Sequence, residues 1–487
     1  MSILATHAPA TLWKHFEALS RIPRVSRNER AAADYVLGIA TARGLKSVRD
    51  AAGNVLVRKP AAPGCEDRAA VILQSHLDMV GQKTAASAHD FARDPLTLRV
   101  DGGWLKAEGT TLGADNGIGV AAALALLEST DVRHGPVSAL FTVEEEIGLH
   151  GAAAVTPEML QGDLLVNLDS DLPGELITGC AGALTMRAEF PGERDAVPVL
   201  WRGLRVRLHG LQGGHSGADI HRGRANALRT LARMLAETAS AVPLRLCTFL
   251  GGDARNAIPR EASALVTVPA GECSSATSTL WALVDAIRAE YQDTEPGLAV
   301  SIEECPAPAR ALPGDATLRF LTFLRAGPIG VIRTLPTQDG AVETSNNLAI
   351  VECGETGPAV VQYLARSVVE STKWDVFGTL GGLAQLAGGK IEAQGNYPGW
   401  KPAAHSRLVP ILAAACERVL GRPARTSVVH GGLECGILMA AKPSLDCVSI
   451  GPRIESMHSP DERVEIASVD AFYRILTFAL ESLPKAG

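Results

Sequence analysis

The chain has 487 residues, a length that favours two domains over one hydrophobic core. Its composition is that of an ordinary globular protein, with 46% hydrophobic and 20% charged residues. The net charge of -7 argues against a nucleic-acid-binding protein, which would show a basic face. No apolar run reaches the roughly 18 residues expected of a membrane span, so we expect neither a nucleic-acid partner nor a membrane partner.

The cysteine pattern and the N-terminal segment predict a cytoplasmic protein. The nine cysteines are scattered and include no C-x-x-C pair, which argues against a disulfide framework and against a thiolate metal site. The N-terminal segment lacks the basic region followed by an apolar core that defines a secretory signal.

The first part of the chain alternates helical and strand-like segments. A helix is predicted over 28–44, and a buried helix rich in Ala and Leu over 116–129. Short apolar runs, typical of strands covered on both faces, lie at 68–80, 135–143 and 162–171. This alternation predicts an α/β domain with a largely parallel sheet.

From about Arg187 the pattern changes to strands with one polar face. Residues 200–211 alternate apolar and basic side chains, and a helix is predicted to follow over 223–242. A strand, a helix and a strand are predicted within 261–305, and a strand over 342–353 precedes a long helical stretch over 359–388.

The α/β pattern returns near the C-terminus, with a predicted helix over 406–421 and a predicted strand over 445–452. We therefore expect one α/β domain in two sequence pieces, 1–186 and 394–487, interrupted by an α+β insert at 187–393.

Acids and histidines follow the predicted strands. They are His76 and Asp78, Asp115, Glu144 to Glu146, Asp169 and Asp171, and His458. Because ligands of open α/β sheets bind beyond the carboxyl ends of the strands, one site would collect these side chains.

Each of these residues has a plainer explanation when it is taken alone. His76 could be a satisfied histidine beside a surface acid, Asp115 a helix N-cap, and Asp169 a polar strand end. Together, however, two histidines and several carboxylates without cysteine form the ligand set of zinc or manganese in a hydrolytic site. Two ions fit when one carboxylate bridges them, and such a pair activates water near neutral pH.

The motifs SHLDMV, LGADNGIG, EEIG, NLDSD, GGHSG and MHSPDE occur in this order and resemble those of the M20 family of co-catalytic zinc peptidases. The similarity is closest to the dipeptidase branch of the family and runs from about residue 10 to the C-terminus. It implies a mainly parallel-sheet catalytic domain with an inserted lid or dimerisation domain. It also implies a homodimer that hydrolyses unblocked dipeptides, with a pair of Zn²⁺ ions in each subunit and Mn²⁺ or Co²⁺ as substitutes.

The resemblance implies roles at the matching positions. Asp115 would bridge both ions, His76 and Asp169 would complete the ligands of one ion, and Glu146 and His458 those of the other.

Further features follow from the same resemblance. Asp78 would orient His76, and the peptide bond between Asp115 and Asn116 would be cis. Aspartate at position 169 is typical of the aminopeptidases and dipeptidases of the family, whereas deacylases and carboxypeptidases usually have glutamate.

The run of three glutamates can be resolved with the family pattern of Glu-Glu, one residue and Gly. Gly148 sets the register, so that Glu145 would be the general base and Glu146 a metal ligand, while Glu144 has no role. Neighbouring residues of an extended segment point in different directions, which allows this division. Ile147 departs from the small residue that is common at its position.

The insert contains a candidate site of its own. His215 lies in a Gly-rich turn that Ser216 could cap, but the resemblance implies that it stabilises the oxyanion, in its own or a partner subunit's site. Asn256 and Arg260 resemble substrate-contacting lid residues, and Arg260 could hold the substrate carboxylate. Glu434, in the catalytic domain, could receive the substrate amino group. Ordinary surface salt bridges remain the alternative for these three substrate contacts.

Two alternatives to a dipeptidase stay open. One is a related tripeptidase or N-acyl-amino-acid deacylase, and the other is a homologue that binds peptides without catalysis. The preferred side chains, including a preference for a C-terminal histidine, and the physiological metal are not determined by the sequence.

Overall fold

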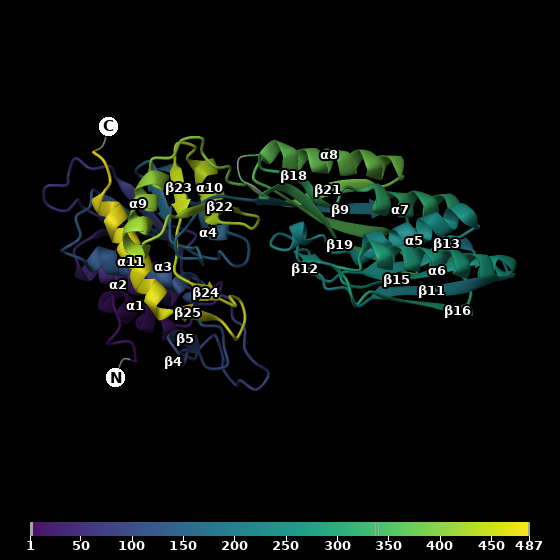
Figure 1. Cartoon of the computed structure of the whole chain (residues 1–487), viewed down its shortest axis with the longest axis horizontal. Helices are drawn as coiled ribbons and strands as arrows, with labels where there is room; N and C mark the ends of the chain where they lie inside the picture. Colours follow the sequence, from purple (N-terminus) through teal and green to yellow (C-terminus); the bar gives the residue numbers. More distant parts are fainter. Residues whose placement is uncertain (1–2, 337, 339, 486–487) are drawn as a thin grey trace. The chain divides into compact units, whose positions relative to one another are not determined.

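The computed structural model describes residues 3–336, 338 and 340–485, which divide into two units (Figure 1). The first unit lies within Met1–Cys180, Trp400–Val428 and Leu433–Gly487, and the second comprises Ala181–Gly399 and Val429–Gly432. The insert that we expected at 187–393 falls inside the second unit. Among the described residues, no helix combines the length and the apolar character that a membrane crossing requires.

An eight-stranded sheet forms the centre of the first unit. Its strands, in order across the sheet, are β1 (Lys46–Arg49), β2 (Val55–Lys59), β6 (Val137–Thr142), β3 (Val71–His76), β7 (Leu164–Asn167), β23 (Asp446–Ser449), β8 (Glu175–Cys180) and β22 (Arg425–Val429).

The middle of this sheet is parallel. β3 pairs with β6 and β7, and β7 pairs with β23, all in parallel, whereas the pairs β1–β2, β2–β6 and β23–β8 are antiparallel. Every residue of β3 and β6 is buried, as predicted for strands covered on both faces. The parallel strands therefore end together at one edge of the sheet.

The helices of the first unit pack into a single apolar core with this sheet. Its helices are α1 (Ala10–Ser20), α2 (Arg30–Ala42), α3 (Ala114–Glu128), α4 (His150–Ala154), η1 (Pro157–Met159), α9 (Leu408–Leu420), α10 (Glu434–Ala441) and α11 (Ile466–Glu481). Figure 1 shows α1, α2, α3, α9 and α11 grouped together, and all of them contribute to the core. Nearly all of α3 is buried, because it is apolar on every side.

A small sheet completes the first unit. Its strands, in order, are β24 (Ile454–Glu455), β25 (Arg463–Glu465), β5 (Trp104–Ala107) and β4 (Leu98–Asp101). β24 and β25 flank the loop that carries His458.

The second unit is built on an antiparallel sheet with its own apolar core. Its main path runs β16 (Ala299–Pro306), β11 (Trp201–His209), β15 (Ala262–Pro269), β13 (Arg245–Gly251), β19 (Val342–Cys353), β20 (Ala359–Ser367), β9 (Gly182–Phe190) and β21 (Lys390–Tyr397), and β18 (Gly330–Thr334) pairs with β19. In β11, buried apolar residues alternate with exposed ones, so one face of the sheet is covered.

Helices of the second unit provide that cover, and two short strand pairs join segments that are distant in the sequence. The helices are α5 (Ala227–Ala241), α6 (Cys273–Glu290), α7 (Gly314–Ala326), α8 (Glu370–Leu386), η2 (Ile220–Arg222) and η3 (Ala270–Glu272). The short pairs are β10 (Asp195–Ala196) with β17 (Arg310–Ala311), and β12 (Gly214–His215) with β14 (Ala257–Ile258). The two units confirm the predicted α/β domain with a separate α+β part.

The predicted helical stretch over 359–388 is wrong in about its first third. Residues Ala359–Ser367 form β20, and the helix α8 begins only at Glu370. β20 pairs with both β19 and β9, so sheet hydrogen bonds on two sides override the apparent helical spacing of its apolar residues.

The close approach of α3 to the strand ends provides a test of this packing. A Cβ atom at Gly119 would overlap Asn116 Oδ1 and the carbonyl oxygen of Leu168, whereas a Cβ at Gly38 of α2 would meet nothing within 4 Å. We expect Gly119→Ala to lower the free energy of unfolding by about 1–3 kcal/mol through overpacking. The matched control Gly38→Ala should raise it by up to about 1 kcal/mol, because alanine favours a helix over glycine. Chemical denaturation measures both changes, and equal effects of the two substitutions would contradict the described packing.

Candidate metal centre

The parallel strands and the start of α3 bring the predicted ligands to one edge of the central sheet. His76 is the last residue of β3, Asp115 lies in the first turn of α3, Glu145 and Glu146 follow β6, Asp169 follows β7, and His458 follows β24. Residues far apart in the sequence thus meet because the three parallel strands end at the same edge.

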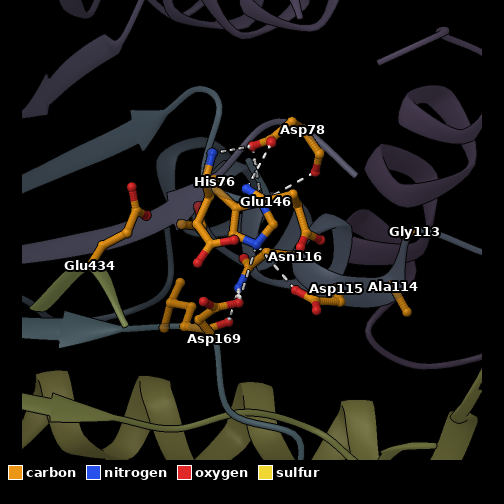
Figure 2. A network of polar contacts seen from close by, with 12 residues as sticks. His76, Asp78, Gly113, Ala114, Asp115, Asn116, Glu146, Asp169 and Glu434 are labelled. Atoms are coloured by element: carbon orange, nitrogen blue, oxygen red, sulfur yellow. Dashed lines mark hydrogen bonds and ion pairs between the residues drawn. The ribbon is translucent and has the colours of Figure 1, made fainter. Parts of the chain in front are cut away.

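Asp115, at the start of α3 (Figure 2), faces both histidines of the cluster. Its Oδ1 is 3.1 Å from Nε2 of His76, and its Oδ2 is 3.3 Å from Nε2 of His458. His76 Nε2 also lies 3.5 Å from Asp169 Oδ1, and His458 Nε2 lies 3.0 Å from Glu146 Oε2. The two carboxylate oxygens of Asp115 therefore face two separate groups.

Both groups have the geometry to hold a metal ion. The donor atoms of His76, Asp115 and Asp169 lie within 4.8 Å of one another, as do those of Asp115, Glu146 and His458. Glu146 Oε1 is buried and has no hydrogen-bond partner in the described chain, so a donor or a cation would complete it. Nitrogen and carboxylate donors without thiolate suit zinc, manganese and related ions.

Glu145 lies at the same cluster. Its carboxylate is within 4.8 Å of donor atoms of His76 and Glu146, so this residue could also contribute a ligand atom. Geometry alone thus allows Glu145 to be a ligand or a base.

Asp78 supports two parts of the cluster at once. His76 Nδ1 lies 3.3 Å from Asp78 Oδ1, which directs the opposite ring nitrogen, Nε2, at the metal-binding group. The same carboxylate accepts hydrogen bonds from the backbone N–H groups of Glu145 and Glu146, both at 3.1 Å, and from Ser26 Oγ at 2.8 Å. The second function, which holds the glutamate turn, was not predicted from the sequence.

The three adjacent glutamates point in different directions. Glu144 has a positive φ of 52°, and its carboxylate lies 2.9 Å from Nδ1 of the exposed His150. Glu145 closes the turn, because its carbonyl accepts from the N–H groups of Gly148 and Leu149. Glu144 therefore faces away from the cluster that its two neighbours join.

The start of α3 carries the predicted cis peptide between Asp115 and Asn116. The Asn116 amide donates to Asp169 Oδ1 and, at 2.9 Å, to the carbonyl of Leu168. Asn116 therefore ties the Asp115 turn to the end of β7. Asp171, which also follows β7, is in neither group of candidate ligands among the described residues.

Burial and crowding raise the pKa values of two carboxyl groups in the cluster. Burial raises the pKa of Glu145 well above its ordinary value, against the charge of His76, and neighbouring carboxylates including Asp169 add to the rise. Burial likewise raises the pKa of Asp169 to about 6, although His76 opposes it.

Asp115 behaves in the opposite way. Burial would raise its pKa, but hydrogen bonds from His458 and His76 outweigh burial and hold the pKa well below its ordinary value. The contacts with Asp115 and Glu146 raise the pKa of His458 to about 11. The cluster contains more acids than bases, and the cost of burying that negative charge favours the binding of cations.

Glu434 lies next to the cluster but is completely buried. Its carboxylate accepts hydrogen bonds from Thr142 Oγ1 at 2.7 Å and from Gln74 Nε2. Burial raises the pKa of Glu434 to about 7, against the charge of His76. Figure 2 shows this side chain near the candidate metal ligands.

His215 belongs to the second unit, where β12 pairs with β14. Its Nδ1 accepts hydrogen bonds from the N–H groups of Gly217 at 3.2 Å and Ala218 at 3.0 Å, which puts the proton of the neutral ring on Nε2. Asp219 accepts from the His215 N–H at 2.9 Å. The turn is thus closed by His215 and Asp219 and not by the Ser216 hydroxyl.

The other predicted residues of the second unit lie beside this turn. Ser216 N–H donates to the carbonyl of Asn256 at 2.8 Å, and Asn256 immediately precedes β14. Arg260 is exposed and forms no ion pair with the described residues. The alternative of a surface salt bridge at Arg260 is therefore not found among the described residues.

Sequence analysis missed Arg366, which lies on β20 in the second unit. Only 6% of the residue is exposed, yet its guanidinium contacts just Ser216 Oγ at 3.5 Å and the Tyr397 hydroxyl at 3.4 Å, with no carboxylate in the described residues. Buried arginines are ordinarily paired, so Arg366 favours an anion. No motif marked it, because its isolation from acids arises only in the folded sheet.

Sequence analysis also missed two buried charged residues, Arg24 and Glu462, that hold the turn before Asp115. The sequence gives one indication of this role, because Glu462 is the last residue of the MHSPDE motif.

The chain is similar over nearly its full length to two dipeptidases. The chain is 41% identical over 484 residues to the cytosol non-specific dipeptidase of Escherichia coli, an alignment that covers 99% of this chain and all of the relative. It is also similar to the crystal structure of aminoacylhistidine dipeptidase from Vibrio alginolyticus, with a TM-score of 0.93, 41% identity and coverage of 100% of this chain and 99% of that one.

A more distant structure shares the fold. The structure of a tripeptidase from Staphylococcus aureus matches with a TM-score of 0.56 and 17% identity, covering 98% of each chain. The sequence model of Peptidase family M20/M25/M40 matches residues 72–482. The chain therefore belongs to the M20 family of peptidases.

Proposed function

We propose that this chain is a cytoplasmic dipeptidase that uses two divalent metal ions per subunit, normally Zn²⁺, to hydrolyse unblocked dipeptides. The observation that carries the proposal is Asp115, whose two carboxylate oxygens each face a different histidine within two groups of donor atoms. The full-length similarity to a cytosol non-specific dipeptidase and to an aminoacylhistidine dipeptidase supports the substrate class and the location.

The ligand assignment follows the two groups. His76 and Asp169 would hold one ion, Glu146 and His458 the other, and Asp115 both. Asp78 would keep His76 oriented through Nδ1. When bound, the ions acidify a water molecule and polarise the scissile carbonyl group.

Glu145 is the proposed general base. It would accept a proton from the water that attacks the carbonyl carbon and then donate a proton to the leaving amine as the C–N bond breaks. Burial and neighbouring carboxylates raise its pKa, which suits a group that must accept a proton. Glu146 differs because its carboxylate faces His458.

Residues of the second unit are proposed to bind the substrate. His215 would donate from Nε2 to the oxyanion, in its own or a partner subunit's site, and its Nδ1 contacts support that tautomer. Arg260, with Asn256 beside it, would bind the substrate carboxylate. Arg366 is a second candidate for that carboxylate, because it is a buried cation without an acidic partner. A homodimer is part of the proposal.

Glu434 is the proposed partner of the substrate amino group. Glu434 is fully buried, and Thr142 and Gln74 donate hydrogen bonds to its carboxylate. The residues that cover Glu434 would therefore have to move before a substrate could reach it.

Removal and return of metal test the centre itself. The free energy of unfolding of metal-stripped protein should rise by about 2.7 kcal/mol for each occupied site when Zn²⁺ is added at a hundredfold excess over its dissociation constant, because the ions bind only the folded state. Thermal or chemical denaturation measures the gain. Asp169→Asn should reduce it, and an unchanged unfolding curve for the wild type with zinc or manganese would refute the metal centre.

The three glutamates provide a matched series for the catalytic roles. Glu145→Gln should lower kcat by about 10²- to 10⁴-fold while metal content stays that of the wild type, because a general base is lost and no ligand is. Glu146→Gln should lower metal affinity, and Glu144→Gln should change neither quantity. Metal analysis and turnover of a dipeptide give the readouts. Wild-type turnover by Glu145→Gln at full metal content would exclude Glu145 as the base.

A panel of substrates distinguishes the proposed dipeptidase activity from the alternative activities. The metal-loaded enzyme should hydrolyse unblocked dipeptides, including those with C-terminal histidine, faster than tripeptides or N-acetyl amino acids, because it would bind both substrate termini. Product analysis gives kcat/KM for each class. Activity confined to N-acetyl amino acids would identify a deacylase, preference for tripeptides would identify a tripeptidase, and binding without turnover would identify a non-catalytic homologue.

A further inference from the structure

We propose that Arg24 and Glu462 act as positioning residues that hold the turn before Asp115 in its metal-binding conformation. We call this pair the Arg24–Glu462 clamp. The inference deepens the proposed function and rests on it, because it concerns the same metal centre.

The Glu462 carboxylate holds the turn by accepting hydrogen bonds from the backbone N–H groups of the turn. Its Oε2 accepts from Leu112 at 2.7 Å and Gly113 at 2.9 Å, and its Oε1 accepts from Ala114 at 2.8 Å and Asp115 at 3.3 Å. Only 2% of Glu462 is exposed. Four consecutive N–H groups at the start of α3 thus converge on one buried carboxylate, an arrangement that stabilises an anion and orders the turn.

Arg24 holds the same turn through a carbonyl group. One of its terminal nitrogens, Nη2, donates to the carbonyl oxygen of Gly113, and the other, Nη1, donates to those of Leu77 and Asp78, both at 2.9 Å. Arg24 is also only 2% exposed. One guanidinium therefore connects the turn before Asp115 to the segment that follows His76.

Two glycines of the LGADNGIG motif leave space for this guanidinium. A Cβ atom would lie 2.5 Å from Arg24 Nη2 at Gly113 and 2.6 Å at Gly117. Gly113 also has a φ of 66°, which glycine adopts without strain. Any larger residue at these two positions would therefore collide with the Arg24 guanidinium.

The clamp connects separate ligand-bearing segments. Glu462 lies four residues after His458 in the same loop, so its hydrogen bonds tie the loop of one predicted ligand to the turn of the bridging ligand Asp115. Arg24 ties that turn to the segment of His76 and Asp78. Since the bridging carboxylate must face both ions, a shift of this turn would weaken both sites together.

The test is the metal affinity of Glu462→Gln. Glutamine has almost the same size, but it loses the charge and replaces one acceptor oxygen with an NH₂ group that faces backbone donors. We expect the affinity for Zn²⁺ and for Mn²⁺, measured by competition with a metal-binding dye on folded protein, to fall by about 10- to 100-fold. Arg24→Lys should weaken binding in the same direction, because a single ammonium group cannot span both segments, and it gives the answer if Glu462→Gln does not fold.

Glu295→Gln is the matched control. Glu295 is 3% exposed and also accepts from two backbone N–H groups, those of Gln212 at 2.7 Å and Ala225 at 3.0 Å, but it lies in the second unit. This variant should be destabilised in the metal-free state and keep wild-type metal affinity.

The outcomes separate the clamp from a general structural role. Wild-type affinity in folded Glu462→Gln or Arg24→Lys, with only a lower melting temperature, would overturn the clamp, and so would an equal loss of affinity in Glu295→Gln. A wild-type protein that binds no metal would instead refute the proposed function.

Discussion

The crowding of carboxylates at one edge of the central sheet is the constraint on which the first unit is built. The acids concerned are Asp78, Asp115, Glu145, Glu146 and Asp169. Like charges at such distances repel, so each acid needs compensation from donors that do not move. Asp78 shows how this is achieved, since one buried carboxylate accepts two backbone N–H groups and a hydroxyl while it faces His76. Fixed donors of this kind keep the acids in place and leave the ring nitrogens of the histidines directed at the cluster.

The same constraint explains the unusual start of α3. Helix N-termini favour negative charge, and here the charge comes from Glu462, outside the helix, while Asp115 itself points at the two histidines. Arg24 binds the turn from its carbonyl side. Two residues that are far apart in the sequence, Arg24 and Glu462, thus meet at one turn. Both contributions depend on the core that brings α1, α3 and β25 into one unit.

The second unit combines an antiparallel sheet with short strand pairs, which place His215 on β12 and Arg366 on β20. The guanidinium of Arg366 is buried without a carboxylate partner in the described residues. The first unit gathers acids at one edge of its sheet, whereas the second unit holds a buried cation.

The sequence by itself determined the α/β and α+β parts, the strand ends that carry His76, Glu145, Glu146 and Asp169, and the family, because short apolar runs and ordered motifs are local signals. It did not determine that 359–367 is a strand, since neighbouring strands on both sides decided that. Nor could it identify the second function of Asp78, the isolation of Arg366, or the pairing of Arg24 with Glu462 around one turn. These depend on contacts between residues as far apart as Glu462 and Leu112, and only the packed tertiary structure creates such contacts.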